Sequence, residues 1–292
     1  MTRTYMNRLY AGAFVFVIAF PLLQAQEQVL RTASLTTEHA LQVNVEGGFG
    51  TLHVLRGPGD AVFAIKSIGE EQDHQRVTVS YSVKDRTGVL HIELNTGADE
   101  DGLSDLLHLF KGSSGGRWQL ELTDQIPIDY RMEFGGGHAD LDFSGLRISN
   151  IRLEAGASSL NIRMKTPNPE RLKLVSISAG LGSIHSETLG NLNFERLRFE
   201  GGLGSYSLDL AGAIRDGAKI YAEVGLGSLD ILIPQSLGVR ATCDDSWLSS
   251  ARFHRFERAD DESYQTPNYS SASRRVSMSL ESGIGSVSVR WK

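Results

Sequence analysis

A glycine-centred pattern returns at regular intervals along this chain and constrains its fold more than any other feature. Seven copies occur, and the first position of every copy is glycine. From the second to the sixth copy, the starts are separated by 21, 24, 22 and 23 residues. A period near 22 residues indicates a fold built from one repeated structural unit. The copies are Gly48-Phe49-Gly50, Gly135-Gly136-Gly137, Gly156-Ala157-Ser158, Gly180-Leu181-Gly182, Gly202-Leu203-Gly204, Gly225-Leu226-Gly227 and Gly283-Ile284-Gly285.

Apolar residues alternate with polar ones on both sides of each copy. The residues five and seven positions before the third residue of a copy are apolar or aromatic in all seven cases. The residues two and four positions after it follow the same rule, with Ser186 as the one exception. Because a period of two is typical of a strand with one buried face, we expect two short strands per repeat, joined at a glycine corner.

Two all-β architectures fit this pattern. In a parallel β-solenoid each repeat of about 22 residues forms one coil, and equivalent residues stack at about 4.8 Å. In an antiparallel sandwich each glycine pair forms a hairpin turn. We favour the solenoid, because it explains why the same residue type returns at the same phase of every repeat.

Glutamate recurs on the outward face, four positions before the third residue of six copies. Like charges directly opposed on a sheet are unfavourable, so such a column needs solvent, basic partners or cations. Arg131, Arg152 and Arg198 lie two residues earlier on the same face and can neutralise three of the six. We therefore interpret the column as a solvated ion-pair stripe, and a weak divalent-cation or polymer-contacting stripe is the alternative. Its members are Glu46, Glu133, Glu154, Glu200, Glu223 and Glu281.

A second outward column, three positions after the third residue of each copy, is polar but not uniform. We interpret its histidines as surface residues, because no tetrahedral set of metal ligands recurs. The column contains His53, Asp140, Asn161, His185, Ser207, Asp230 and Ser288.

The amino terminus has the features of a secretory signal peptide. Two arginines precede an apolar run from Leu9 to Leu23, and a small residue, Ala25, follows. The run is shorter than the roughly 20 residues that cross a bilayer, so cleavage after Ala25 is favoured over a retained membrane anchor. We expect residues 26–292 to be exported, to the periplasm or the cell surface, with no transmembrane segment after cleavage.

The exported part is expected to be a single domain. It contains one cysteine, Cys243, so it cannot form an internal disulfide and depends on a large regular core. A short amphipathic helix is predicted over 103–110. The predicted divisions are irregular coils over 26–125, regular repeats over 126–240, an aromatic and arginine-rich insertion over 241–275, and last strands over 276–292.

The insertion over 241–275 is the most varied stretch of the chain. Aromatic and arginine side chains together favour contact with a ligand or partner, but a solenoid end also needs a cap over its core. Both interpretations stay open. The candidate binding residues are Trp247, Phe253, Phe256, Tyr264, Tyr269, Arg252 and Arg255.

Charge and motif content restrict the function. The chain has 29 basic and 35 acidic residues, a net charge of −6, which argues against binding to nucleic acid or anionic lipid. No phosphate-binding loop, nucleophile elbow or zinc-protease motif occurs, so no catalytic residue, cofactor or metal is predicted. A carbohydrate-active enzyme, a polysaccharide lyase or hydrolase on a solenoid, remains the alternative. It would require carboxylates and aromatics that converge in a cleft.

About 60% of the chain resembles the toast-rack domains of unknown function. The resemblance is carried by Ile126-Pro127-Ile128-Asp129-Tyr130, the glycines from 135 to 137, Leu153-Glu154-Ala155-Gly156 and Gly283-Ile284-Gly285-Ser286. These domains are similar to the extracytoplasmic part of Lia-type cell-wall-stress regulators. The resemblance implies a β-helix-like fold, an envelope location and no known enzymatic activity, although this chain lacks the regulators' transmembrane helices.

The resulting functional hypothesis is a non-enzymatic exported protein of the cell envelope, acting as a scaffold, adhesion or stress-sensing module. Its partner would be an envelope protein, a glycan or a lipid component. The edges of the solenoid could also pair with another copy of the chain to form a homo-oligomer.

Overall fold

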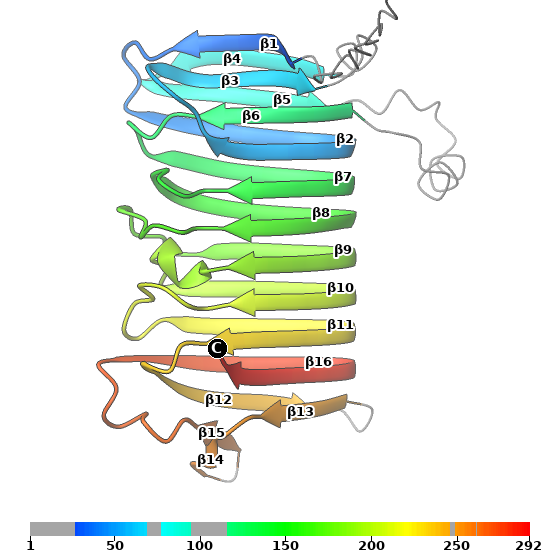
Figure 1. Ribbon diagram of the computed structural model, residues 1–292, viewed down its shortest axis with the longest axis vertical. Coiled ribbons are helices and arrows are strands. Elements are labelled where there is room, and N and C mark those ends of the chain that lie inside the picture. Colours follow the sequence, from blue (N-terminus) through cyan, green and yellow to red (C-terminus); the bar gives the residue numbers. More distant parts are fainter. Residues whose placement is uncertain (1–26, 69–76, 95–115, 246–248, 261) are drawn as a thin grey trace, which may run out of the picture.

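The protein is all-β in the computed structural model, which describes residues 27–68, 77–94, 116–245, 249–260 and 262–292. Figure 1 shows the strands stacked one above another in a tall column, in one mixed sheet of sixteen strands. They are β1 (Glu27–Ser34), β2 (Ala40–Arg56), β3 (Ala61–Ile68), β4 (Val77–Lys84), β5 (Thr87–Leu94), β6 (Gly116–Leu122), β7 (Ile128–Asp142), β8 (Ile148–Arg163), β9 (Val175–Glu187), β10 (Arg196–Asp209), β11 (Lys219–Ile233), β12 (Leu237–Asp245), β13 (Ser249–Phe253), β14 (Glu257–Arg258), β15 (Ser263–Gln265) and β16 (Arg274–Trp291).

Helical structure is scarce in the described part of the chain. A 3-10 helix, η2 (Leu189–Leu192), lies between β9 and β10. The short helix predicted over 103–110 lies outside the described residues. Within the described ranges, no helix is both long and apolar enough to cross a membrane.

The regular part of the sheet consists of β2, β7, β8, β9, β10, β11 and β16, which pair in parallel in this order. Antiparallel pairs occur towards the two ends, for example β1 with β3 and β12 with β15. The register aligns the repeats, so that Gly204 lies opposite both Gly182 and Gly227. Each glycine pair lies inside a strand and therefore does not form the hairpin turn that a sandwich would require.

Each repeat forms one long strand rather than the two short strands that we expected. These strands are 13 to 18 residues long and run through the glycine corner without a break. The strands are continuous because residues at the corner still pair with the two adjacent strands. Leu203, for example, pairs with Leu181 on β9 and with Leu226 on β11.

The core is built from the inward residues of the alternating pattern. The largest side chains, including Trp118, Tyr130 and Phe199, are fully buried. Ser186, the exception to the apolar rule at the inward positions of the repeat, is also buried. Its hydroxyl donates to the carbonyl of Ser207 (3.3 Å) and accepts from the amide of Asp209 (3.0 Å). This exception to the pattern is tolerated because a buried polar group is costly only when it lacks partners.

The glycine corners are places where successive backbones approach too closely for a side chain. A Cβ added to Gly227 would lie 1.9 Å from the carbonyl oxygen of Gly204. The same clash recurs one repeat earlier, between Gly204 and the carbonyl oxygen of Gly182, at 2.0 Å. Gly227 also has a φ of +140°, which residues with a side chain rarely adopt. At these positions glycine is therefore a steric requirement of the stacking, whereas β8 has Ser158 at the equivalent position.

Glu38, in the loop between β1 and β2, is a buried carboxylate with three hydrogen bonds. Tyr81 Oη donates to Oε1 (2.5 Å), and the amide and hydroxyl of Thr36 donate to Oε2 (2.7 and 3.0 Å). Burial alone raises the pKa of Glu38, but these hydrogen bonds outweigh it and lower the pKa from 4.5 to about 2. Tyr81 also packs on Phe63, with ring centroids 5.2 Å apart.

Substitution of a corner glycine should destabilise the fold far more than substitution of an unhindered one. Gly227→Ala meets backbone 1.9 Å away, and we expect it to lower the free energy of unfolding by about 3 kcal/mol or more. Gly217, with a φ of +76° and nothing within 4 Å of an added Cβ, is the matched control. Gly217→Ala should cost only about 1 kcal/mol of backbone strain. Urea unfolding of both variants tests this, and equal losses would contradict the steric argument.

The Tyr81–Glu38 hydrogen bond should make part of the stability dependent on acid pH. Because the pKa of Glu38 is lowered in the folded state, its contribution is present above pH 4.5 and is lost as pH falls towards 2. Tyr81→Phe should therefore be less stable than the parent by about 1 kcal/mol at pH 7, and this difference should shrink between pH 4.5 and 2. Urea unfolding across this range measures it, with Tyr221→Phe as the exposed control. A difference that stays constant with pH would refute the assignment.

Candidate functional site

The outward glutamates form one continuous column in the structure, and this acidic column is longer than the sequence predicted. In-register pairing places Glu93 on β5 beside Glu46, and Asp244 on β12 beside Glu281. Sequence reasoning missed both residues, because neither strand contains a glycine pair from which the outward position could be counted. Eight carboxylates on nine neighbouring strands result, interrupted only by Ser178. In order along the stack the column is Glu93, Glu46, Glu133, Glu154, Ser178, Glu200, Glu223, Glu281 and Asp244.

Two of the three expected arginine partners contact the acidic column. Arg152 Nε lies 2.5 Å from Glu154 Oε1, and Arg198 pairs with Glu200 in the same way. The prediction for Arg131 was wrong, because its guanidinium instead donates to both carboxylate oxygens of Asp129 (3.2 and 2.8 Å). Asp129 and Glu133 are equally far from Arg131 in sequence, two residues before and two residues after it. The Arg131 guanidinium pairs with Asp129, where it forms two hydrogen bonds, one to each carboxylate oxygen.

The remaining carboxylates of the column have fewer partners. His91 Nδ1 lies 3.8 Å from Glu46 Oε1. Among the described residues, Glu133, Glu223 and Glu281 form no ion pair, and all three are exposed. Solvent thus screens much of the like charge, as the ion-pair stripe interpretation requires. Within the described ranges, no three His, Cys, Asp or Glu side chains are arranged to hold a metal ion.

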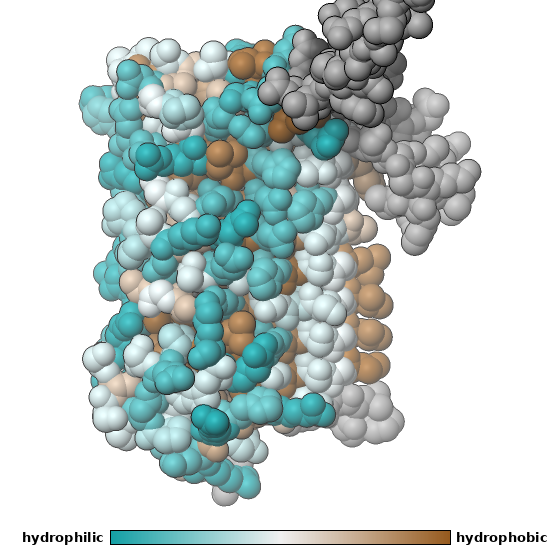
Figure 2. All heavy atoms as spheres, in the orientation of Figure 1, coloured by the Kyte–Doolittle hydropathy of each residue, from teal (hydrophilic) through white to brown (hydrophobic). Residues whose placement is uncertain are grey.

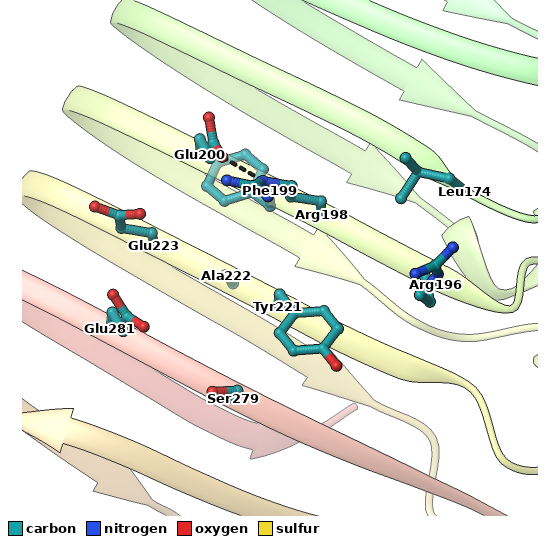
Figure 3. A pocket seen from close by; sticks show the side chains of 10 residues that line it. All are labelled: Leu174, Arg196, Arg198, Phe199, Glu200, Tyr221, Ala222, Glu223, Ser279 and Glu281. Carbon is teal, nitrogen blue, oxygen red and sulfur yellow. Dashed lines mark hydrogen bonds and ion pairs between the residues drawn. The ribbon is translucent and has the colours of Figure 1, made fainter.

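A groove of about 420 Å³ runs over β10, β11 and β16 on this face. Figure 3 shows Glu200, Glu223 and Glu281 one above another on successive strands, with Tyr221 towards the other end of the groove. Tyr221 and Leu174 are exposed apolar side chains that line the groove, and Arg196 and Arg198 lie beside them. The groove therefore combines a row of hydrogen-bond acceptors, an aromatic ring and two cationic groups.

The second outward column contains one compact cluster, centred on Asp140. His53 Nδ1 and His138 Nε2 each lie 3.2 Å from an oxygen of this carboxylate, and Asn161 Nδ2 donates to it at 2.8 Å. Burial raises the pKa of Asp140. Hydrogen bonds from Asn161 and His138 and the electrostatic attraction of His138 and His53 outweigh burial, so the pKa is lowered overall. The cluster joins β2, β7 and β8 on the outside of the stack, which suits the surface role predicted for these residues.

The aromatic residues of the 241–275 insertion gather at the carboxyl-terminal end of the stack. The rings of Phe253 and Tyr264 stack with centroids 4.7 Å apart, and Phe256 packs on Phe253 (5.5 Å) and on Trp291 (6.4 Å). Phe253, Phe256 and Trp291 are partly buried against the core. This placement supports the cap interpretation for these residues. Trp247 lies outside the described residues.

The other candidates in the insertion lie on the surface. Tyr269 sits under the guanidinium of Arg240, 4.8 Å from the ring centroid. Arg252 is exposed on β13, opposite Ser288 of β16. Arg255 lines two shallow pockets of about 320 and 240 Å³, both of which include Trp291. The structure thus divides the predicted binding residues between a partly buried aromatic cap and a solvent-facing rim, and does not bring them all together in one site.

An exposed column of aliphatic side chains, which we call the apolar ridge, was not predicted from the sequence. Figure 2 shows hydrophobic side chains projecting from one edge of the stack. They are the middle residues of four glycine pairs, with 45% to 51% of each side chain exposed. The sequence did contain a sign of this column, because the middle residue of each Gly-Leu-Gly triplet is apolar but does not occupy one of the inward positions of the repeat. In register along the stack, the ridge is Leu181, Leu203, Leu226 and Ile284.

Comparison with solved structures finds similar chains of low sequence identity. A Clostridium sporogenes protein provisionally described as a cell adhesion protein is 17% identical, with 92% of this chain and 100% of that chain covered and a TM-score of 0.47. A provisionally described adhesin from Bacteroides fragilis is 13% identical over 91% and 97% of the two chains, with a TM-score of 0.30. One from Parabacteroides merdae is 10% identical over 91% and 96%, with a TM-score of 0.28. At these values the likeness carries no information on ligand or activity.

Comparison with protein families is more informative. No curated protein matches the chain. The family described as the N-terminal domain of toast_rack, DUF2154, matches residues 24–187, which are 164 of the 292 residues. This match includes the first four copies of the glycine-centred pattern and the amino-terminal half of the acidic column. The chain therefore belongs to the toast-rack family.

Proposed function

We propose that this protein is an exported, non-enzymatic contact protein of the cell envelope, a scaffold or adhesion module that binds an extended glycan through the groove over β10, β11 and β16. The single observation that carries the proposal is this groove, in which the row of Glu200, Glu223 and Glu281 continues a column that extends along the stack. The sequence features of a signal peptide support export.

The rigidity of the proposed scaffold comes from a parallel β-solenoid. Seven strands pair in parallel and in register, and each contributes a corner that begins with glycine and inward residues at equivalent positions. In a solenoid, every repeat contacts only its neighbours, so outward side chains form straight columns at the strand spacing of about 4.8 Å. A surface of this kind suits a partner that is itself long and repetitive.

The chemistry of the groove suits a polysaccharide. Carboxylates such as Glu223 and Glu281 accept hydrogen bonds from sugar hydroxyls. An exposed aromatic ring such as Tyr221 offers an apolar face together with a polar hydroxyl. Arg196 lies beside the groove and can pair with an acidic sugar. These groups are spread along the stack, so each repeat of a polymer would meet its own part of the surface.

Glycan cleavage is the second candidate function, and the same groove provides a specific reason to test it. Strands of a sheet lie about 4.8 Å apart, close to the roughly 5–5.5 Å that separates the two carboxyl groups of retaining glycosidases. Against cleavage, Glu223 and Glu281 are exposed on the face of the sheet, whereas catalytic carboxylates converge in a cleft that excludes water. Contact without turnover is therefore the function we favour.

Binding to insoluble envelope glycans tests the proposal. We expect the purified protein to co-sediment with isolated peptidoglycan or with an insoluble neutral polysaccharide. The triple variant Tyr221→Ala, Glu223→Gln, Glu281→Gln should lose most of this binding, on the order of a hundredfold in affinity, because three contacts of roughly 1 kcal/mol are removed. Glu133→Gln, on the same column but outside the groove, should bind as the parent does.

The same samples separate the two candidate functions. Release of soluble sugar that depends on Glu223 would establish the enzymatic alternative and overturn the non-enzymatic assignment. Equal sedimentation of the parent and the triple variant, or none by either protein, would remove the groove as a glycan contact.

A further inference from the structure

The apolar ridge is the most unusual exposed surface of the described chain. Four large aliphatic side chains stand in one line on β9, β10, β11 and β16, each about half exposed. The residues before and after each of them are glycines, so no neighbouring side chain on the same strand covers them. Contiguous apolar surface in a soluble protein commonly marks a contact site.

We infer that the apolar ridge is a self-association surface, on which a second copy of this chain docks about a two-fold axis parallel to the stack. The inference concerns a different surface from the groove and does not depend on the proposed function. The contact is isologous, and because the axis runs along the ridge, each ridge residue meets its own counterpart.

The spacing of the ridge is the first argument for a second copy as the partner. The side chains repeat with the strand spacing of about 4.8 Å, because they occupy one register position on four adjacent strands. A partner surface fills this row only if its own apolar groups have the same spacing. A second copy has that spacing necessarily, so the side chains of the two ridges can pack row by row along their whole length.

The charge on either side of the ridge is the second argument, and it selects the orientation. Along each strand, the acidic-column position is three residues before the ridge residue, as Glu200 is before Leu203. A column of serines lies two residues after it on all four strands. This serine column consists of Ser183, Ser205, Ser228 and Ser286.

The two possible two-fold axes have opposite electrostatic consequences. With the axis parallel to the stack, each acidic column lies on the side of the partner's serine column, which carries no charge, so like charges are not opposed. With the axis perpendicular to the stack, the two acidic columns lie on the same side and repel each other. The parallel arrangement is therefore the one that the charges permit.

The size of the ridge predicts the strength of the contact. Four half-exposed side chains bury a few hundred Å² at most, whereas a standard stable interface buries about 800 Å² on each partner. The dimer should therefore be reversible and should form at high protein concentration. The acidic column also disfavours an anionic lipid surface as the occupant of the ridge.

Sedimentation velocity over a wide range of protein concentration tests self-association. We expect the parent protein to shift reversibly from monomer to dimer as its concentration rises, and the double variant Leu203→Ser, Leu226→Ser to remain monomeric. Val83→Ser, which removes a side chain of similar exposure from β4, should dimerise as the parent does. A parent that stays monomeric, or a ridge variant that still dimerises, would overturn the inference. Loss of vesicle binding in the ridge variant, without any dimer of the parent, would also overturn it and identify lipid as the occupant.

Cysteine cross-linking tests the orientation. In a Cys243→Ser background, Leu203→Cys alone should cross-link to itself through a short bis-maleimide, because each residue faces its counterpart about a parallel axis. In the perpendicular arrangement, Leu203→Cys would instead cross-link to Leu226→Cys when the two variants are mixed. That pattern would refute the proposed axis. Glycan sedimentation of the ridge variants, at a protein concentration where the parent is monomeric, and dimerisation of the groove variant Tyr221→Ala should both be unchanged. Failure of one proposal is then distinguishable from failure of the other.

Discussion

The close approach of successive backbones at the glycine corners is the constraint on which the rest of this structure depends. The carbonyl oxygen of Gly204 occupies the place where a side chain on Gly227 would lie, and the relation between Gly285 and Gly227 is the same. Since no side chain separates the corners, the long strands can bend there and still pair in parallel through the bend. The bend in turn lets every strand direct its alternating apolar residues into one core.

In-register stacking also determines what the outside of the molecule can be. Any residue type that recurs at one phase of the repeat becomes a straight column, whether or not its members attract one another. The acidic column is an unfavourable arrangement in this respect, and only Glu154 and Glu200 have arginine partners within the described ranges. A column that opposes like charges contributes little to folding. Its regularity therefore supports the proposed contact with a partner rather than a role in stability.

Much of this architecture could be predicted from the sequence, because the information is local and repeated. The glycine pairs, the inward residues on both sides of them and the six glutamates follow from counting along the chain. Glu93 and Asp244 could not be found in this way, since their place in the column depends on which strands pair across long separations. The partner of Arg131 was a choice between two carboxylates at equal spacing, which only side-chain packing decides. The packing of Phe253 on Tyr264 likewise depends on the fold of the insertion.

The apolar ridge and the acidic column belong to the same strands but lie on either side of the glycine corner, and this separation has a consequence for the assembled molecule. A two-fold axis parallel to the stack places the acidic column of one copy and that of its partner on opposite flanks of the dimer. Each groove then stays open to solvent and faces away from the other. Such a dimer presents two equivalent contact sites that engage two separate polymer strands, or two stretches of one strand, with a gain in avidity that needs no new contact. Weak self-association would thus strengthen a scaffold whose individual contacts are weak.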